Sequence, residues 1–173
     1  ESFFEAIDAP TLFDTPAVFA KQELFAIPGW GKAALAYGLV PVAREAGAST
    51  LRAMIRAAKG AVADGRPLVI FPEGTRSLPN GLGKFKRSAA WISLKSGYPI
   101  VRAVVQCGSP ILMKQWKWYN VPPHSTELHF KIYDTINPTD FLEGQPCGPI
   151  PARRLTDYLR RFYEGELHGT SFT

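Results

Sequence analysis

The hexapeptide with the clearest chemical potential is Phe-Pro-Glu-Gly-Thr-Arg, residues 71–76, which directly follows an apolar run predicted to be a buried strand. Arg76 offers a planar fork for two phosphate oxygens, and Gly74 lets backbone amides approach a ligand closely. Glu73 can brace the arginine or accept a hydroxyl hydrogen bond, and Thr75 adds a small donor. Because ligands collect outside the carboxyl ends of strands in open α/β sheets, this order predicts a phosphate-monoester cradle. The alternative is a turn with a surface Glu–Arg pair.

Charge is distributed unevenly along the 173 residues, which carry a net charge of +5. No Asp or Glu occurs between Gly74 and Thr126, a span that contains Arg76, Lys84, Lys86, Arg87, Lys95, Arg102, Lys114 and Lys117. Such a span predicts a face that meets a phosphorylated ligand, a phospholipid surface or nucleic acid. The alternative is a set of solvated cations whose acidic partners come from elsewhere in the chain.

Hydrophobic periodicity predicts strands alternating with helices. Helices are expected over 2–14, 23–38 (broken at Pro28-Gly29), 50–63, 86–96 and 152–167, and strands over 17–22, 39–42, 67–71, 99–106 and 127–133. The predicted fold class is α/β, a single domain over 1–173 with a mostly parallel or mixed central sheet covered by helices. No run of 18 apolar residues is present, so no segment is expected to span a bilayer.

Several segments resemble the glycerophospholipid acyltransferases of the 1-acylglycerol-3-phosphate acyltransferase type. The 71–76 hexapeptide resembles the most specific motif of that family. The stretch from Lys21 to Gly31 is similar to its Lys-x-Glu-Leu…Ile-Pro-x-x-Gly segment, and Gly38 to Arg44 is similar to a motif whose arginine helps to hold acceptor phosphate. Residues 81–90 follow the main motif as in the family, and 98–105 is similar to its apolar strand, with Arg102 in place of a second proline.

The family's catalytic signature is a histidine with an acid five residues later and often a serine two residues after the histidine. Ser2 and Glu5 match the serine and the acid, so the histidine would precede Glu1. The resemblance therefore implies an acyltransferase domain that lacks its N-terminal segment, in a piece of a longer protein. The 173 residues alone are expected to be inactive, because a histidine would serve as the general base with the carboxylate fixing its tautomer.

The resemblance implies transfer of a fatty acyl group from acyl-CoA or acyl carrier protein to 1-acylglycerol-3-phosphate, giving phosphatidic acid in phospholipid biosynthesis. Glu5 would be the catalytic acid. The acceptor phosphate would be bound by Arg44, Glu73, Gly74, Thr75 and Arg76, with Ser2 and Lys21 in support. Attack on the thioester would be direct, so Cys107 is expected to be a packing residue. The alternatives are a non-catalytic lipid- or phosphate-binding module and an acyltransferase acting on another lysolipid.

The expected partners are a lysophosphatidic-acid-like acceptor, an acyl-CoA or acyl carrier protein donor, and a phospholipid surface. The implied location is the cytoplasmic face of a membrane, either peripheral or anchored by an upstream segment. In residues 112–123, two lysines alternate with aromatic side chains. If the stretch is exposed, it suits a phospholipid interface; the alternative is a loop whose tryptophans pack in the core. Nucleic acid is not expected, because no recognisable nucleic-acid module accompanies this stretch. A structural metal is not expected, because the two cysteines and three histidines show no ligand spacing. The resemblance implies no cofactor, with acyl-CoA or acyl carrier protein as the co-substrate.

Overall fold

The computed structural model describes residues 16–43, 47–74, 81–107 and 127–169. These residues fall into two compact units. The N-terminal unit comprises the described residues up to Phe71, and the C-terminal unit comprises the described residues from Pro72 onward. Each unit is described by itself.

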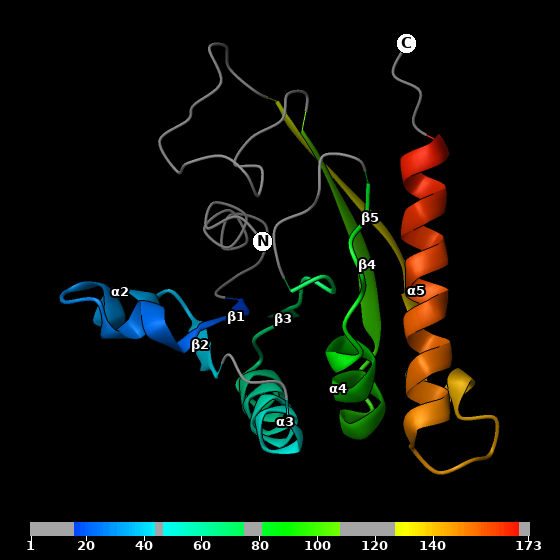
Figure 1. The fold of residues 1–173 in the computed structure, drawn as a ribbon, viewed down its shortest axis with the longest axis horizontal. Helices are drawn as coiled ribbons and strands as arrows, with labels where there is room; N and C mark the ends of the chain where they lie inside the picture. The colour runs from blue at the N-terminus through cyan, green and yellow to red at the C-terminus, as the bar shows by residue number, and fades with distance from the viewer. Residues whose placement is uncertain (1–15, 44–46, 75–80, 108–126, 170–173) are drawn as a thin grey trace. The chain divides into compact units, whose positions relative to one another are not determined.

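The N-terminal unit is built on a parallel three-stranded sheet with the strand order β2-β1-β3 (Figure 1). Val18 of β1 pairs with Leu39 of β2 on one side and with Val69 of β3 on the other. The helical segments connect the strands in chain order. The elements are β1 (Ala17–Lys21), the 3-10 helix η1 (Gln22–Ala26), α2 (Trp30–Ala36), β2 (Leu39–Val42), α3 (Ala48–Ala63) and β3 (Leu68–Val69).

One arginine joins the amino ends of the three parallel strands. The Arg66 guanidinium, just before β3, donates to the carbonyl of Pro16 at 3.4 Å and to the carbonyl of Gly38 at 3.3 Å. These residues precede β1 and β2, respectively. A side chain at Gly38, where φ is +82°, would clash with this guanidinium. The amino edge of the sheet is thus fixed, and Lys21 lies at the opposite edge, at the end of β1.

The C-terminal unit combines an antiparallel strand pair with two helices. Ile100 at the start of β4 pairs with Ile136 at the end of β5, and the register shifts between Val101 and Ala103. Figure 1 shows α5 lying alongside the two strands, with α4 beside its amino-terminal half. The elements are α4 (Ser88–Ser96), β4 (Ile100–Cys107), β5 (Leu128–Ile136), the 3-10 helix η2 (Pro138–Phe141) and α5 (Pro149–Gly169).

The core of the C-terminal unit forms where α4 and α5 meet. Apolar side chains at 3–4 residue spacing on each helix face the same interior, as the helical period requires. The buried members of this cluster are Phe85, Ala90, Leu94, Ile136, Ala152, Leu155 and Leu159. Phe85 lies between the motif region and α4 in sequence, so the segment that follows the motif is anchored by the same core.

Truncation of Leu155 is expected to destabilise the C-terminal unit. Leu155 has no exposed surface, and its removal would leave a cavity in the α4–α5 core. We expect Leu155→Ala to lower the free energy of unfolding by about 2–5 kcal/mol, measured by urea denaturation. The control is Ile150→Ala on the same helix, because Ile150 is 59% exposed. Equal losses in the two variants would contradict this account of the core.

Polar contacts also bind α5 to the strands. Tyr163 donates to the Ala103 carbonyl at 3.1 Å, and burial raises the pKa of its hydroxyl. Tyr133 donates to the Glu166 carboxylate, and Lys131 lies 3.4 Å from it. The Tyr133 hydrogen bond, followed by that of Lys131, lowers the pKa of Glu166, and the same network raises the pKa of Lys131. These contacts hold the helix that carries Arg160 in register with β5.

The predicted α/β class is confirmed, with a parallel sheet and helices in the order expected. The strand predicted over 67–71 is limited to Leu68–Val69, because Pro67 lacks an N–H and the chain turns at Pro72. The helix expected over 86–96 begins at Ser88, and the closing helix is longer than 152–167. The 2–14 helix and the 112–123 stretch lie outside the described residues. Within the described part of the chain, no helix is both long and apolar enough to cross a membrane.

The boundaries of the predicted domain, 1–173, stay a prediction.

Candidate functional site

The candidate site is centred on the turn that follows β3. Pro72 and Glu73 form this turn, and Gly74 follows with φ +61°, a left-handed conformation that glycine adopts without strain. The backbone conformation of the turn therefore follows from the residue types, a proline at its start and a glycine at the position with positive φ. The sequence predicted that Gly74 would let backbone amides approach a ligand closely, and a positive φ is compatible with that prediction.

Two hydrogen bonds fix the turn to the segment that follows the motif. Glu73 is 9% exposed, and its side chain accepts the Gly83 N–H at 2.8 Å, while the Lys86 N–H donates to the Pro72 carbonyl at 2.7 Å. The sequence suggested an arginine or a hydroxyl as a partner of Glu73, and that pairing stays a prediction; the backbone amide of Gly83 is a partner that the sequence did not indicate. A carboxylate that accepts a backbone N–H is a stronger anchor than a neutral pair.

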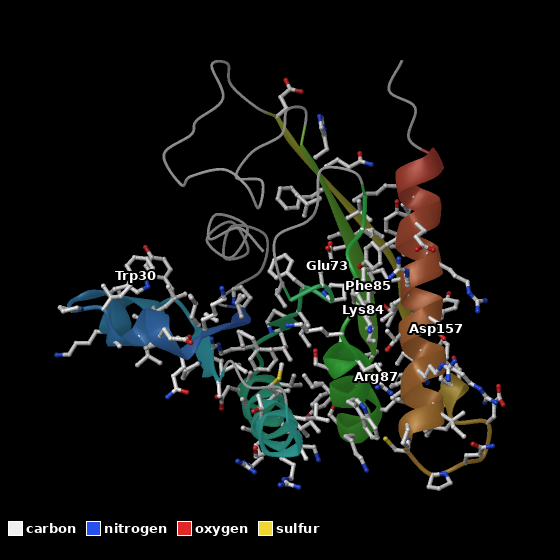
Figure 2. All side chains as sticks on the ribbon, viewed as in Figure 1. Trp30, Glu73, Lys84, Phe85, Arg87 and Asp157 are labelled. Carbon is white, nitrogen blue, oxygen red and sulfur yellow. The ribbon has the colours of Figure 1, made fainter. Side chains whose placement is uncertain are left out.

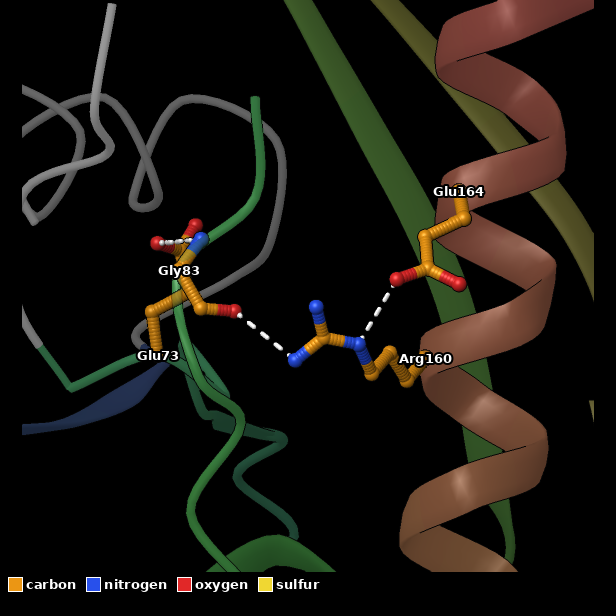
Figure 3. Close-up of polar contacts among 4 residues, drawn as sticks. All are labelled: Glu73, Gly83, Arg160 and Glu164. Carbon is orange, nitrogen blue, oxygen red and sulfur yellow. Dashed lines mark hydrogen bonds and ion pairs between the residues drawn. The ribbon is translucent and has the colours of Figure 1, made fainter. Parts of the chain in front are cut away.

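The anchor extends from Gly83 to α5 (Figure 3). The carbonyl of Gly83 accepts a hydrogen bond from Arg160 Nη1 at 3.4 Å, and Arg160 Nε donates to Glu164 at 2.7 Å. The amide and the carbonyl of Gly83 are thus both engaged, one by the motif glutamate and one by the helix. A Cβ at Gly83 would lie 2.5 Å from Glu73 Oε2, so only glycine allows this approach.

Lys86 is the described cation that lies against the motif. A Cβ built on Gly74 would be 2.7 Å from Lys86 Nζ and 2.9 Å from its Cδ and Cε, so the lysine side chain lies over the glycine. Lys86 is exposed and forms no ion pair with the described residues. Sequence reasoning counted Lys86 in the acid-free span but did not assign it to the site. The sequence signal for this role was that Lys86 directly follows Phe85. Because the Phe85 side chain is buried in the core, its position determines where the Lys86 side chain lies.

Of the remaining predicted site residues, one is described by the structure and five are not. Lys21 is the last residue of β1 and is exposed, in the N-terminal unit. Ser2, Glu5, Arg44, Thr75 and Arg76 lie outside the described residues, and their roles stay predictions. In the described ranges, no group of three or more His, Cys, Asp or Glu side chains is gathered as metal ligands. Cys147 is a free, half-buried thiol, whereas the side chain of Cys107 lies outside the description.

The N-terminal unit contains an apolar hollow of about 170 Å³. It lies where the carboxyl halves of β1 and β2 face the first turns of α3. Such a lining suits a hydrocarbon segment more than a charged group. Its lining residues are Phe19, Gln22, Val40, Pro41, Val42, Ala43, Thr50, Ala53, Met54 and Ala57.

Comparison with known proteins identifies the class. The family model described as Acyltransferase matches residues 6–106, which is more than half of the chain. The chain therefore belongs to the acyltransferase family. The match includes the described motif turn and the glycine that anchors it.

Two curated relatives and one solved structure extend this comparison. The chain is 34% identical over 101 residues, 58% of its length, to a chloroplastic 1-acyl-sn-glycerol-3-phosphate acyltransferase of Brassica napus, of which it covers 29%. It is 27% identical over 150 residues, 84% of its length, to a 1-acyl-sn-glycerol-3-phosphate acyltransferase of Helicobacter pylori, of which it covers 59%. The fold is similar to that of the 1-acyl-sn-glycerophosphate acyltransferase PlsC from Thermotoga maritima, with a TM-score of 0.56 and 24% identity over 92% of this chain and 59% of that one. The chain thus spans less than two thirds of each of these proteins.

Proposed function

We propose that the protein transfers a fatty acyl group from a thioester donor to the free hydroxyl of a lysophosphatidic-acid-type acceptor, which gives a phosphatidic acid. The observation that carries this proposal is the anchored Pro72–Glu73–Gly74 turn with the Lys86 ammonium lying over Gly74. Arg76 follows two residues later in the sequence. The turn and the two cations suit a phosphate monoester, and the names of the two curated relatives support this acceptor.

The reaction follows from the chemistry of alcohols and thioesters. The acceptor hydroxyl oxygen attacks the thioester carbonyl carbon, a C–O bond forms and the C–S bond breaks. The proton of the hydroxyl ends on the departing thiol. A positively charged site that binds the phosphate would hold the acceptor hydroxyl close to the thioester carbon. The reaction would then proceed between two bound groups and not between two molecules that meet in solution. The histidine partnered by Glu5 would take the proton.

The donor and the location are part of the same proposal. The donor would be acyl-CoA or acyl carrier protein, and the protein would act at the cytoplasmic face of a membrane, where its lipid acceptor resides. The acid-free span 75–126 supports contact with anionic headgroups, since basic segments are attracted to such surfaces at physiological salt.

A panel of acceptors tests the function. The full-length protein should acylate lysophosphatidic acid in preference to lysophosphatidylcholine and to monoacylglycerol, because only the first presents a phosphate monoester. The measurement is product formation from radiolabelled acyl-CoA, and from acyl carrier protein in a parallel series. Binding of lysophosphatidic acid without turnover would favour the non-catalytic module, and preference for a diester headgroup would favour another lysolipid.

A further inference from the structure

A basic hollow lies between the segment that follows the motif and α5. Its volume is about 290 Å³, near the lower end of the usual range for small-molecule sites. Figure 2 shows Lys84, Phe85 and Arg87 beside α5, which carries Asp157. The lining residues, which define the basic hollow, are Lys84, Phe85, Arg87, Arg153, Thr156 and Asp157.

Core packing and hydrogen bonds fix the backbone around the basic hollow. Phe85 is 6% exposed and packs in the α4–α5 core, with its ring centroid 5.8 Å from that of Tyr163. Thr156 is buried, and its hydroxyl donates to the Ala152 carbonyl at 2.7 Å. Gly83, the residue before the hollow, is bound by Glu73 and Arg160. The backbone that presents Lys84 is therefore fixed before any ligand arrives.

Positive charge predominates in the basic hollow. Three of its lining residues are cations and one is an anion. Arg153 Nε lies 3.9 Å from the Asp157 carboxylate, a loose contact between exposed groups, while Lys84 and Arg87 form no ion pair with the described residues. Helix α4 begins directly after Arg87 and has no acidic residue in its first turn. The partial positive charge of that helix end adds to the three cations.

We propose that the basic hollow binds a phosphate group of the acyl donor's coenzyme A moiety, an inference that rests on the proposed acyl transfer from a thioester. The hollow is lined by residues distinct from those at the motif turn, yet Lys84 follows Gly83 directly. A reaction that brings a phosphorylated acceptor to the turn and a nucleotide thioester to the same protein needs two separate phosphate sites. A lipid headgroup offers the same phosphate chemistry, and the experiment distinguishes the two sources.

The test is calorimetric binding of coenzyme A to the full-length protein. The double variant Lys84→Met/Arg87→Gln should weaken the Kd about tenfold or more, because two charge-assisted contacts are lost. The matched control is Arg56→Gln/Lys59→Met, which removes two exposed cations from α3 and should change the Kd less than about twofold. Asp157→Asn should act in the opposite direction and tighten binding roughly two- to fivefold, since it removes the one acidic side chain among the described residues that line the hollow.

Two further arms identify the source of the phosphate. If the source is coenzyme A, the double variant should raise the KM for acyl-CoA and leave the KM for acyl-pantetheine, which lacks the nucleotide, unchanged. If binding to phosphatidic acid vesicles weakens while coenzyme A binding does not, the hollow takes a lipid phosphate and the coenzyme A assignment is wrong. Unchanged binding in both assays, or no binding by the unaltered protein, overturns the site. If the double variant weakens coenzyme A binding but the unaltered protein acylates no lysolipid, the proposed function is wrong and the basic hollow remains a coenzyme A site.

Discussion

Replacement of Glu73 by alanine is expected to lower kcat/KM for the lysolipid acceptor about ten- to hundred-fold, the equivalent of one hydrogen bond to a charged group. The carboxylate of Glu73, a buried residue, accepts the Gly83 N–H, and the alanine variant would remove this acceptor. Of the two described hydrogen bonds between the turn and the 83–86 segment, the one accepted by the Pro72 carbonyl would remain. Steady-state kinetics with the acceptor varied at saturating donor measures the loss.

Two companion variants separate this anchor from a general loss of stability. Glu73→Gln keeps a side-chain oxygen that can accept from Gly83, so it should lose less activity than Glu73→Ala. Gly83→Ala disturbs the same contact from the other side, because its Cβ would lie 2.5 Å from the carboxylate. The double variant with Glu73→Ala should lose less than the sum of the single losses, since both remove one interaction. Additive losses would show that the two residues act independently.

Much of the fold could be predicted because its signals are local. The 3–4 spacing of apolar residues predicts α3, and the Pro28-Gly29 pair predicts the break between η1 and α2. The short helix η2 was missed, because four residues are too few to show a period. Its signals were Pro138 at the first turn and Asn137, whose side chain accepts the Thr139 N–H at 3.2 Å.

The site was only partly predictable, because its supports come from distant parts of the chain. The sequence indicates that glycine at position 74 allows a positive φ, and the structure has φ +61° there. The contact between Arg160 and the Gly83 carbonyl joins residues 77 positions apart, and no local pattern encodes such a pairing. The position of Lys86 over Gly74 depends on the Phe85 ring entering the α4–α5 core, which is a property of packing. The motif thus identifies the candidate site. The structure adds the contacts that anchor the turn and the position of Lys86 over Gly74.

Lys86→Met is expected to raise the KM for lysophosphatidic acid about ten- to hundred-fold, the range for one lost contact between a cation and a charged acceptor. Methionine keeps the unbranched stem that covers Gly74 but removes the ammonium. The KM for acyl-CoA should stay nearly unchanged, because Lys86 does not line the basic hollow. The measurement is a pair of kinetic series in which acceptor and donor are varied in turn.

The acceptor itself provides the sharpest control for Lys86. With monoacylglycerol, which carries no phosphate, the variant and the unaltered protein should be equally slow, since there is no anion for the ammonium to meet. Lys86→Arg keeps the charge and should recover part of the loss, while Lys59→Met on α3 removes an exposed lysine elsewhere and should have no effect. An equal fall in rate with both acceptors would mean that Lys86 supports the turn only as a packing residue. Selective loss with the phosphorylated acceptor places the Lys86 ammonium in contact with its phosphate.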